Sequence, residues 1–171
     1  MMDCFGDSLT FGFGLKSGYK WIDILVDSGY DIVNYGVNGA VISEIQRQVM
    51  VHVPRDKVFI MGGTNDFVLG GSIDYVLLKY LEINEYLKDK CSKVFLGIPT
   101  PTNPDLWESK SLSNKLEAFQ KKLLSTFPRN RLVDFYQAFT PYDSSLFFDE
   151  IHPNKKGAQK MAQVFLKETR L

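Results

Sequence analysis

Histidine and cysteine are scarce in this sequence, and their scarcity excludes several kinds of site. The 171 residues contain two histidines and two cysteines. Cys4 and Cys91 cannot build the disulfide framework of a small secreted protein, so we expect two reduced thiols. The two histidines and two cysteines are also too widely separated in the sequence to match the ligand spacing of a zinc site.

An excess of charge of one sign and a long hydrophobic run are missing as well. Lys plus Arg number 20 and Asp plus Glu number 20, which gives a formal net charge of +0. Such a balance provides no bulk attraction for nucleic acid. No apolar run approaches the roughly 20 residues that cross a bilayer, and the N-terminus lacks the regions of a signal peptide. We expect a cytoplasmic protein with no integral membrane segment and no nucleic-acid partner.

Five short apolar segments predict the strands of a sheet. Each is rich in Val, Ile or Phe and is mostly apolar on both alternating faces, which is typical of a parallel sheet covered on both sides. The segments are residues 1–5, 31–36, 57–62, 93–98 and 131–136.

Apolar residues at helical spacing lie between these segments. The stripes are Trp21, Ile22, Leu25 and Val26; Val76, Tyr80, Ile83 and Leu87; Leu112, Leu116, Phe119, Leu123 and Phe127; and Ala158, Met161, Ala162 and Phe165. Residues 43–46 read Ser-Glu-Ile-Gln, a capping-box pattern that predicts a helix start at Ser43. Because strands and helices alternate throughout, we predict one α/β domain over residues 1–171, with a doubly wound sheet.

Ligands of doubly wound sheets bind outside the carboxyl ends of the strands, so a site is expected in the loops that follow the strands. The first of these loops contains Gly-Asp-Ser-Leu at 6–9, and the second contains Asn-Gly at 38–39. The third contains Gly-Gly-Thr-Asn-Asp at 62–66, and the last contains Asp-Glu-Ile-His-Pro at 149–153. Under the strand assignment, all four loops meet at one edge of the sheet.

Ser8 and His152 are a candidate nucleophile and base. A serine hydroxyl attacks poorly until a base takes its proton, and histidine is the usual base near neutral pH. Asp149 precedes His152 by three residues, a spacing from which a carboxylate in a tight turn reaches the ring and orients it. The other histidine, His52, follows a helix and precedes a strand at the opposite end of the sheet, so we expect a structural or surface role for it.

Three groups are candidate donors to a developing oxyanion: the backbone N–H groups of Ser8 and Gly39 and the side-chain amide of Asn65. Each also has an ordinary explanation, since Gly39 belongs to a common Asn-Gly turn pair and Asn65 fits a helix cap or an Asx turn. Their joint occurrence with a candidate nucleophile, base and acid favours a catalytic site. We expect the neighbouring Asp7 and Asp66 to hold loops by hydrogen bonds.

These motifs together resemble those of the GDSL esterases, also called SGNH hydrolases. Residues 6–9, GDSL, are similar to the first block of that family, and residues 37–40, VNGA, to the second. Residues 62–66, GGTND, match the third block in full, and residues 149–153 match the D-x-x-H-P block. The four blocks occur in the order of the family and span nearly the whole chain.

The resemblance implies a fold and a chemistry. The fold of the family is a three-layer α/β/α sandwich, flavodoxin-like, with about five parallel strands and helices on both faces. The implied catalytic residues are Ser8, Asp149 and His152, and the implied oxyanion hole is formed by Ser8, Gly39 and Asn65. The implied activity is hydrolysis of carboxylic esters or thioesters through an acyl-enzyme, with no metal and no cofactor.

Other catalytic or nucleotide-binding motifs fit less well. An α/β-hydrolase requires G-x-S-x-G, and residues 6–10 lack the second glycine. Residues 12–17 lack the third glycine of a dinucleotide-binding loop, and the sequence contains no G-x-x-x-x-G-K-[ST]. The alternative of another class is a non-catalytic ligand-binding module on the same fold.

The aromatic residues Phe11, Phe13, Trp107 and Phe148 are candidates for lining a substrate pocket. Core packing explains any of them equally well. The sequence has no large inserted lid, so we expect a small-molecule substrate with a short acyl chain. Lysophospholipids, thioesters and carbohydrate O-acetyl esters are alternatives, and the oligomeric state is left open.

Overall fold

The computed structural model describes residues 1–52 and 56–171, with the side chains of residues 107–109 left out of the description. In chain order its elements are β1 (Met2–Gly6), α1 (Ser8–Phe11), α2 (Trp21–Asp27), β2 (Ile32–Gly36), α3 (Ile42–Val51), β3 (Lys57–Met61), α4 (Thr64–Val68), α5 (Ile73–Leu87), β4 (Lys93–Ile98), α6 (Trp107–Thr126), η1 (Arg129–Arg131), β5 (Leu132–Asp134), α7 (Phe135–Ala138), η2 (Ser144–Leu146) and α8 (Lys155–Thr169).

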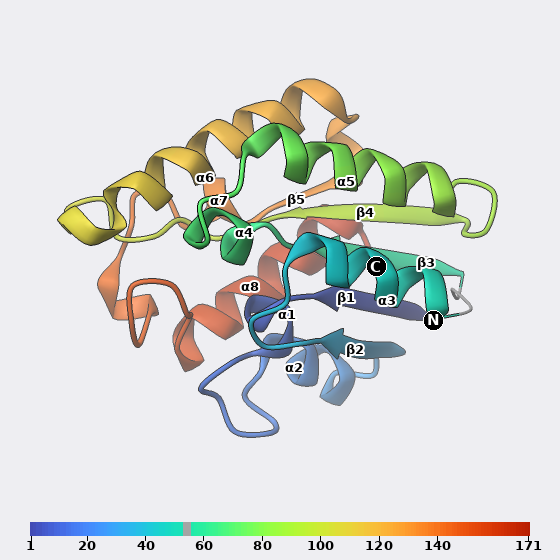
Figure 1. The fold of residues 1–171 in the computed structure, drawn as a ribbon. Helices are drawn as coiled ribbons and strands as arrows, with labels where there is room; N and C mark the ends of the chain where they lie inside the picture. Colours follow the sequence, from blue (N-terminus) through green and yellow to red (C-terminus); the bar gives the residue numbers. More distant parts are fainter. Residues whose placement is uncertain (53–55) are drawn as a thin grey trace.

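The strands form one parallel sheet in the order β2-β1-β3-β4-β5 (Figure 1). This is the strand order of flavodoxin-like doubly wound proteins, and it confirms the predicted α/β architecture. The chain begins in the interior of the sheet, moves outward to β2 and then returns past β1 to β3. The direction of winding therefore reverses between β1 and β3, which is where such sheets bind ligands at their carboxyl edge.

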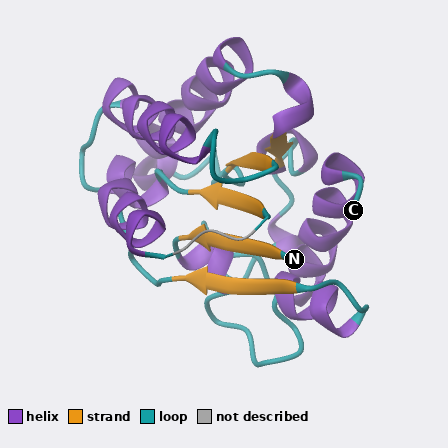
Figure 2. Cartoon of the chain, turned by 90° about the vertical axis from the view of Figure 1, so that its right-hand side faces the viewer, coloured by secondary structure: helices purple, strands orange, loops and turns teal. Residues whose placement is uncertain are grey.

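Helices cover both faces of the sheet (Figure 2). Helices α3, α5 and α6 pack on one face, and α2 and α8 pack on the other. Alternate residues of each strand serve the two cores: in β3, Val58 and Ile60 face one core, and Phe59 and Met61 face the other. This double burial explains why the strands are apolar throughout.

The predicted helical stripes lie against these cores, except for Val26, which was expected in the stripe of α2 but is 45% exposed. Their fully buried members include Val76, Tyr80, Ile83 and Leu87 in α5, Leu116, Phe119 and Leu123 in α6, and Ala158, Met161 and Phe165 in α8. Within the described ranges, none of the helices combines the length and the apolar character that a membrane span requires.

The last strand is shorter than predicted. A strand was expected over residues 131–136, but β5 ends at Asp134. The carboxylate of Asp134 accepts a hydrogen bond from the N–H of Gln137 at 2.9 Å and caps α7. This local cap turns the chain into a helix before the apolar pattern ends.

The N-cap predicted for α3, Ser43, lies two residues beyond the observed one. The helix begins at Ile42, and Val41 is its N-cap residue. The carboxylate of Glu44 accepts a hydrogen bond from the N–H of Val41 at 3.0 Å. The carboxylate of Asp66 accepts one from the N–H of Ile42 at 2.9 Å. Two carboxylates therefore satisfy the first amides of the helix, and the hydroxyl of Ser43 is not needed as a cap.

The phenol of Tyr80 ties α5 to the carboxyl edge of the sheet. It accepts a hydrogen bond from the N–H of Gly62 at 2.9 Å, and its oxygen lies 3.1 Å and 3.0 Å from the carbonyl oxygens of Gly62 and Gly97. Complete burial raises the pKa of Tyr80, so the phenol stays neutral and remains a donor. These hydrogen bonds to Gly62 hold the start of the loop that follows β3.

Replacing Tyr80 with Phe is expected to lower the free energy of unfolding by about 1–3 kcal/mol, because the buried N–H of Gly62 loses its partner. Urea denaturation measures this change. The matched control is Tyr19→Phe, because Tyr19 is 43% exposed; there we expect a change within about 0.5 kcal/mol. Equal stability of Tyr80→Phe and the wild type would contradict the proposed tie.

Candidate active site

Ser8, His152 and Asp149 lie in one hydrogen-bonded line. Ser8 is the first residue of α1, directly beyond β1, and its Oγ lies 3.0 Å from Nε2 of His152. The other ring nitrogen, Nδ1, lies 2.7 Å from Oδ2 of Asp149. The fold thus brings together two side chains that are 144 positions apart in the sequence.

A tight turn holds the acid and the base of this line. Oδ1 of Asp149 accepts hydrogen bonds from the N–H groups of Ile151 at 2.8 Å and His152 at 2.6 Å. Partial burial by itself raises the pKa of Asp149. The hydrogen bonds that its carboxylate accepts from the N–H and the ring of His152 and from the N–H of Ile151 have the opposite effect and are stronger, so the pKa of Asp149 is lowered overall. An ionised acceptor beside Nδ1 favours the tautomer that carries its hydrogen there, which leaves Nε2 as the acceptor facing Ser8.

The segment that carries this turn is fastened to the start of α8 by Asn154. Oδ1 of this N-cap residue accepts hydrogen bonds from the N–H groups of Lys156 at 2.9 Å and Gly157 at 3.2 Å. Its Nδ2 donates to the carbonyl oxygens of Ser145 at 2.8 Å and Phe147 at 3.1 Å. One side chain therefore secures both ends of the segment in which the acid and the base lie.

Ser8 is positioned because α1 lies almost in contact with the end of β2. A Cβ atom on Gly36 would lie 2.3 Å from the backbone nitrogen of Phe11, so only glycine leaves room for the helix there. At the start of α1, Oδ1 of Asp7 accepts a hydrogen bond from the N–H of Leu9 at 2.9 Å. The hydrogen bond expected of Asp7 is confirmed, and it sets the first turn on which Ser8 sits.

Gly39 and Asn65 lie in the loops that flank Ser8. Gly39 is exposed and has a φ of 77°, a left-handed conformation that favours glycine. Nδ2 of Asn65, in α4, donates to the carbonyl oxygen of Ala40 at 3.0 Å and so joins the two loops. Because β1 lies between β2 and β3 in the sheet, the segment that carries Ser8 follows the strand between those that precede these two candidate donors.

Two of the four aromatic residues predicted to line a pocket lie against His152. The ring centroid of Phe13 is 4.7 Å from that of His152. The ring of Phe148 stacks on His152 at 5.7 Å and lies 6.0 Å from Phe13. Both rings are partly exposed, at 41% and 48%. They shield the imidazole from solvent on the outer side of the site.

Of the residues also considered from the sequence, Phe11 and His52 make their described ring contacts with residues other than His152. The ring of Phe11 lies beneath the ammonium group of Lys20, with 3.6 Å between the nitrogen and the ring centroid. Trp107 begins α6, and its side chain lies outside the described residues. The ring of His52 packs 4.5 Å from that of Tyr35, in agreement with the structural role expected for it.

Two carboxyl groups are buried beneath the site. Burial raises the pKa of Asp7 from 3.8 to about 7; the hydrogen bond from Leu9 opposes this shift, and the charge of Asp66 adds to it. Burial also raises the pKa of Asp66, against the hydrogen bond from Ile42. Both accept backbone hydrogen bonds, as expected from the sequence. In the part of the chain that is described, no group of three or more His, Cys, Asp or Glu residues is arranged to hold a metal ion.

A small cavity of about 10 Å³ adjoins Ser8 and His152. Its walls include Leu9, Trp21 from α2 and Met161 from α8. The sequence pattern identifies Trp21 and Met161 only as core members of two helices. Their position beside Ser8 follows from tertiary packing, and no local signal predicts it.

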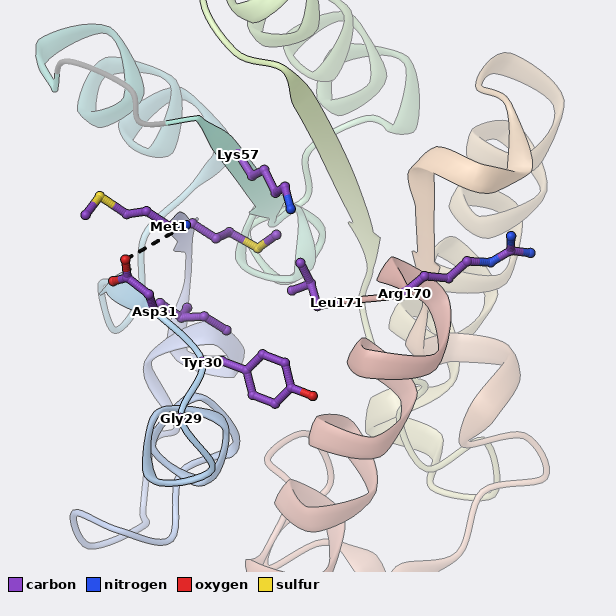
Figure 3. Close-up of a pocket in the computed structure, with 9 residues that line it drawn as sticks. Met1, Gly29, Tyr30, Asp31, Lys57, Arg170 and Leu171 are labelled. Carbon is purple, nitrogen blue, oxygen red and sulfur yellow. Dashed lines mark ion pairs between the residues drawn. The ribbon is translucent and has the colours of Figure 1, made fainter.

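A larger cavity, of about 310 Å³, lies at the opposite edge of the sheet (Figure 3). Its lining includes Met2, Ile32 and Lys57, which are the first residues of β1, β2 and β3. Arg170 also lines it. The N-terminal ammonium group lies 3.9 Å from the carboxylate of Asp31 at this edge. This cavity is at the amino ends of the strands and is separate from the Ser8 site.

The comparison with protein families identifies the chain. The model of the GDSL-like lipase/acylhydrolase family matches residues 4–160, a range that contains Ser8, Gly39, Asn65, Asp149 and His152. The chain belongs to this family. Membership of the GDSL-like family supports ester hydrolysis as the general class of activity. No curated protein sequence matches the chain.

Two solved structures have the same fold as this chain. A member of the lipolytic G-D-S-L family from Veillonella parvula DSM 2008 is 25% identical, with a TM-score of 0.79 over 97% of this chain and 96% of that chain. The acetylxylan esterase Axe2 from Geobacillus stearothermophilus is 20% identical, with a TM-score of 0.76 over 99% of this chain and 94% of that chain. The likeness to Axe2 is a likeness of fold.

Replacing Asp7 with Asn is expected to stabilise the protein at alkaline pH. Asn keeps an acceptor for the N–H of Leu9 but does not ionise. In the wild type, the raised pKa of Asp7 means that its favourable contribution is complete below the unfolded value of 3.8 and is lost as the pH rises through about 7. Since one pKa unit corresponds to about 1.4 kcal/mol, we expect a gain of at least about 1 kcal/mol for the variant at pH 8.

Denaturant unfolding of both proteins at several pH values between 4 and 8 measures this gain relative to the wild type. The matched control is Asp27→Asn, because Asp27 is exposed at the end of α2. A stability difference between Asp7→Asn and the wild type that stays constant over this pH range would contradict the assignment.

Proposed function

We propose that the protein is a serine esterase that hydrolyses carboxylic acyl esters through a Ser-His-Asp triad and an acyl-enzyme. The observation that carries the proposal is the unbroken contact from Asp149 to His152 at 2.7 Å and from His152 to Ser8 at 3.0 Å. A serine hydroxyl becomes a useful nucleophile when a base lies within hydrogen-bond reach and a third group orients that base.

Each member of the line has one task in this mechanism. Nε2 of His152 takes the hydroxyl proton while Oγ of Ser8 attacks the acyl carbonyl carbon. Asp149 stays ionised, holds the ring and stabilises the imidazolium. His152 then protonates the leaving alcohol, and the acyl group remains on Ser8. Water attacks this acyl-enzyme with the same base and releases the carboxylic acid and free Ser8.

The oxyanion of each tetrahedral intermediate is stabilised by the N–H groups of Ser8 and Gly39 and by the amide of Asn65. A side-chain amide carries two N–H donors. One donor of Asn65 is engaged by the carbonyl of Ala40, at 3.0 Å from Nδ2, and the second serves the substrate oxygen. A donor that is oriented before the reaction needs no reorganisation when the charge develops.

Short-chain acyl esters are the proposed substrates. The cavity beside Ser8 and His152 has a volume of only about 10 Å³, which leaves little enclosed apolar space for a long chain. Among such esters, carbohydrate O-acetyl esters are a specific alternative, because the acetylxylan esterase Axe2 has the same fold. The competing proposal is a ligand-binding module that retains the fold without catalysis.

A fluorophosphonate probe, which reacts with activated serines, is expected to label the wild type and not the Ser8→Ala variant. The kcat of that variant for p-nitrophenyl acetate should fall by about 10⁴-fold or more, because the nucleophile is lost. Ser113→Ala is the matched control, because Ser113 in α6 is as buried as Ser8, at 8% exposure each. Absence of labelling in a well-folded wild type would favour the binding module.

Replacing Asn65 with Ala is expected to lower kcat by about 100- to 1000-fold with little change in KM, because the lost donor acts mainly on the transition state. Steady-state kinetics measures both constants, and circular dichroism checks the fold. Asn130→Ala, in an exposed turn beyond α6, is the control and should keep the wild-type kcat. A loss of less than about 10-fold in folded Asn65→Ala would contradict an oxyanion role.

A further inference from the structure

The cavity beside Ser8 is small, and its walls are mostly apolar. Ser8 and His152 form its polar side, and Leu9, Trp21 and Met161 are among its apolar walls. Its volume of about 10 Å³ corresponds to roughly one water-sized group. A methyl group is the substituent that comes nearest to this size.

The walls of this cavity are held by the core. Nε1 of Trp21 donates a hydrogen bond to the carbonyl oxygen of Leu9 at 3.0 Å. The indole ring also packs against Phe59 at 5.8 Å and Phe165 at 5.0 Å between ring centroids. Trp21 and Met161 are each only 1% exposed. Enlarging the cavity therefore requires a buried hydrogen bond or core packing to be disturbed, which is unfavourable.

The position of the cavity relative to the donors decides which part of an ester enters it. Gly39 and Asn65 belong to segments that pack in the core under α3, α5 and α6, whereas the apolar walls of the cavity belong to the core under α2 and α8, on the opposite face of the sheet. In the tetrahedral intermediate formed on Ser8, the carbon carries the oxyanion, which faces these donors, together with the acyl substituent and the alcohol that will leave. A space of about 10 Å³ does not hold an alcohol of ordinary size, so the group that fits the cavity is a small acyl substituent.

We propose that this cavity is the acyl-binding pocket, that it admits the methyl group of an acetyl ester, and that Trp21 and Met161 exclude longer acyl chains. The inference rests on the proposed serine esterase function and narrows its substrate class to acetyl esters. The covalent intermediate is then acetyl-Ser8, and the released acid is acetate. Pocket contacts of this kind distinguish one methylene by about 10- to 200-fold.

The direct test compares p-nitrophenyl acetate, butyrate and hexanoate as substrates of the wild type and of Ser8→Ala. Each kcat/KM is divided by the hydroxide-catalysed rate of the same ester, so that intrinsic reactivity cancels. We expect the Ser8-dependent value for acetate to exceed that for butyrate by at least about 10-fold.

Met161→Ala is expected to enlarge the cavity and to reduce the acetate-to-butyrate ratio by at least about 10-fold, mainly through faster butyrate hydrolysis. Met2→Ala is the matched control, because Met2 is also 1% exposed in the same core but lies at the amino end of β1. This control should keep the wild-type ratio.

Ala158→Val tests the opposite change and serves if Met161→Ala does not fold. Ala158 lines the cavity, and two added methyl groups would fill it. We expect kcat/KM for acetate to fall by about 10-fold or more while the circular dichroism spectrum stays that of the wild type.

The outcomes separate the two proposals. Ser8-dependent hydrolysis with an optimum at butyrate or hexanoate would overturn the acetyl pocket alone. An unchanged ratio in folded Met161→Ala, or an unchanged acetate rate in folded Ala158→Val, would do the same. Absence of any Ser8-dependent hydrolysis would overturn the esterase function and the acetyl pocket together.

Discussion

The candidate site depends on the register of the parallel strands, because their carboxyl ends are aligned at one edge of the sheet. Gly6 is in register with Gly36 on one side and with Met61 on the other, and Met61 is in register with Gly97. The loops that follow these strands therefore start side by side, although they are far apart in the sequence. Glycine at the end of β2 also lets α1 lie directly over the sheet, so that Ser8 emerges at the point where the winding reverses.

Polar groups buried under this edge keep the loops in place, and they do so at some expense of stability. Tyr80 binds the loop beyond β3, and Asp66 binds the first amide of α3. Asp7 caps α1 from a fully buried position, where its charge is unfavourable and its pKa is raised to about 7. Buried hydrogen bonds of this kind hold a loop in one conformation, because a hydrogen bond has a preferred direction and a hydrophobic contact does not.

Much of the fold was predictable because burial on both sides of the sheet makes every strand apolar along its whole length. The start of α3 and the end of β5 were not, because the carboxylates of Asp66 and Asp134 cap helices through contacts that an apolar pattern does not record. The candidate site followed from motifs that lie at the strand ends. The sequence does not predict that Trp21 and Met161 lie beside Ser8, because helical spacing indicates that a residue is buried but not which residue it is buried against.

The turn that contains Asp149 divides the geometry of the Ser8, His152 and Asp149 line into a local and a long-range part. The backbone bonds from Ile151 and His152 and the bond to the ring all lie within four consecutive residues. Asp149 and His152 are thus held together by local bonds, and Asn154 fastens the ends of their segment to the start of α8. Only the separation of Oγ of Ser8 from Nε2 of His152 must be set by tertiary packing. A movement of α8 against α1 would therefore act on this single distance, and His152 would shift together with Asp149.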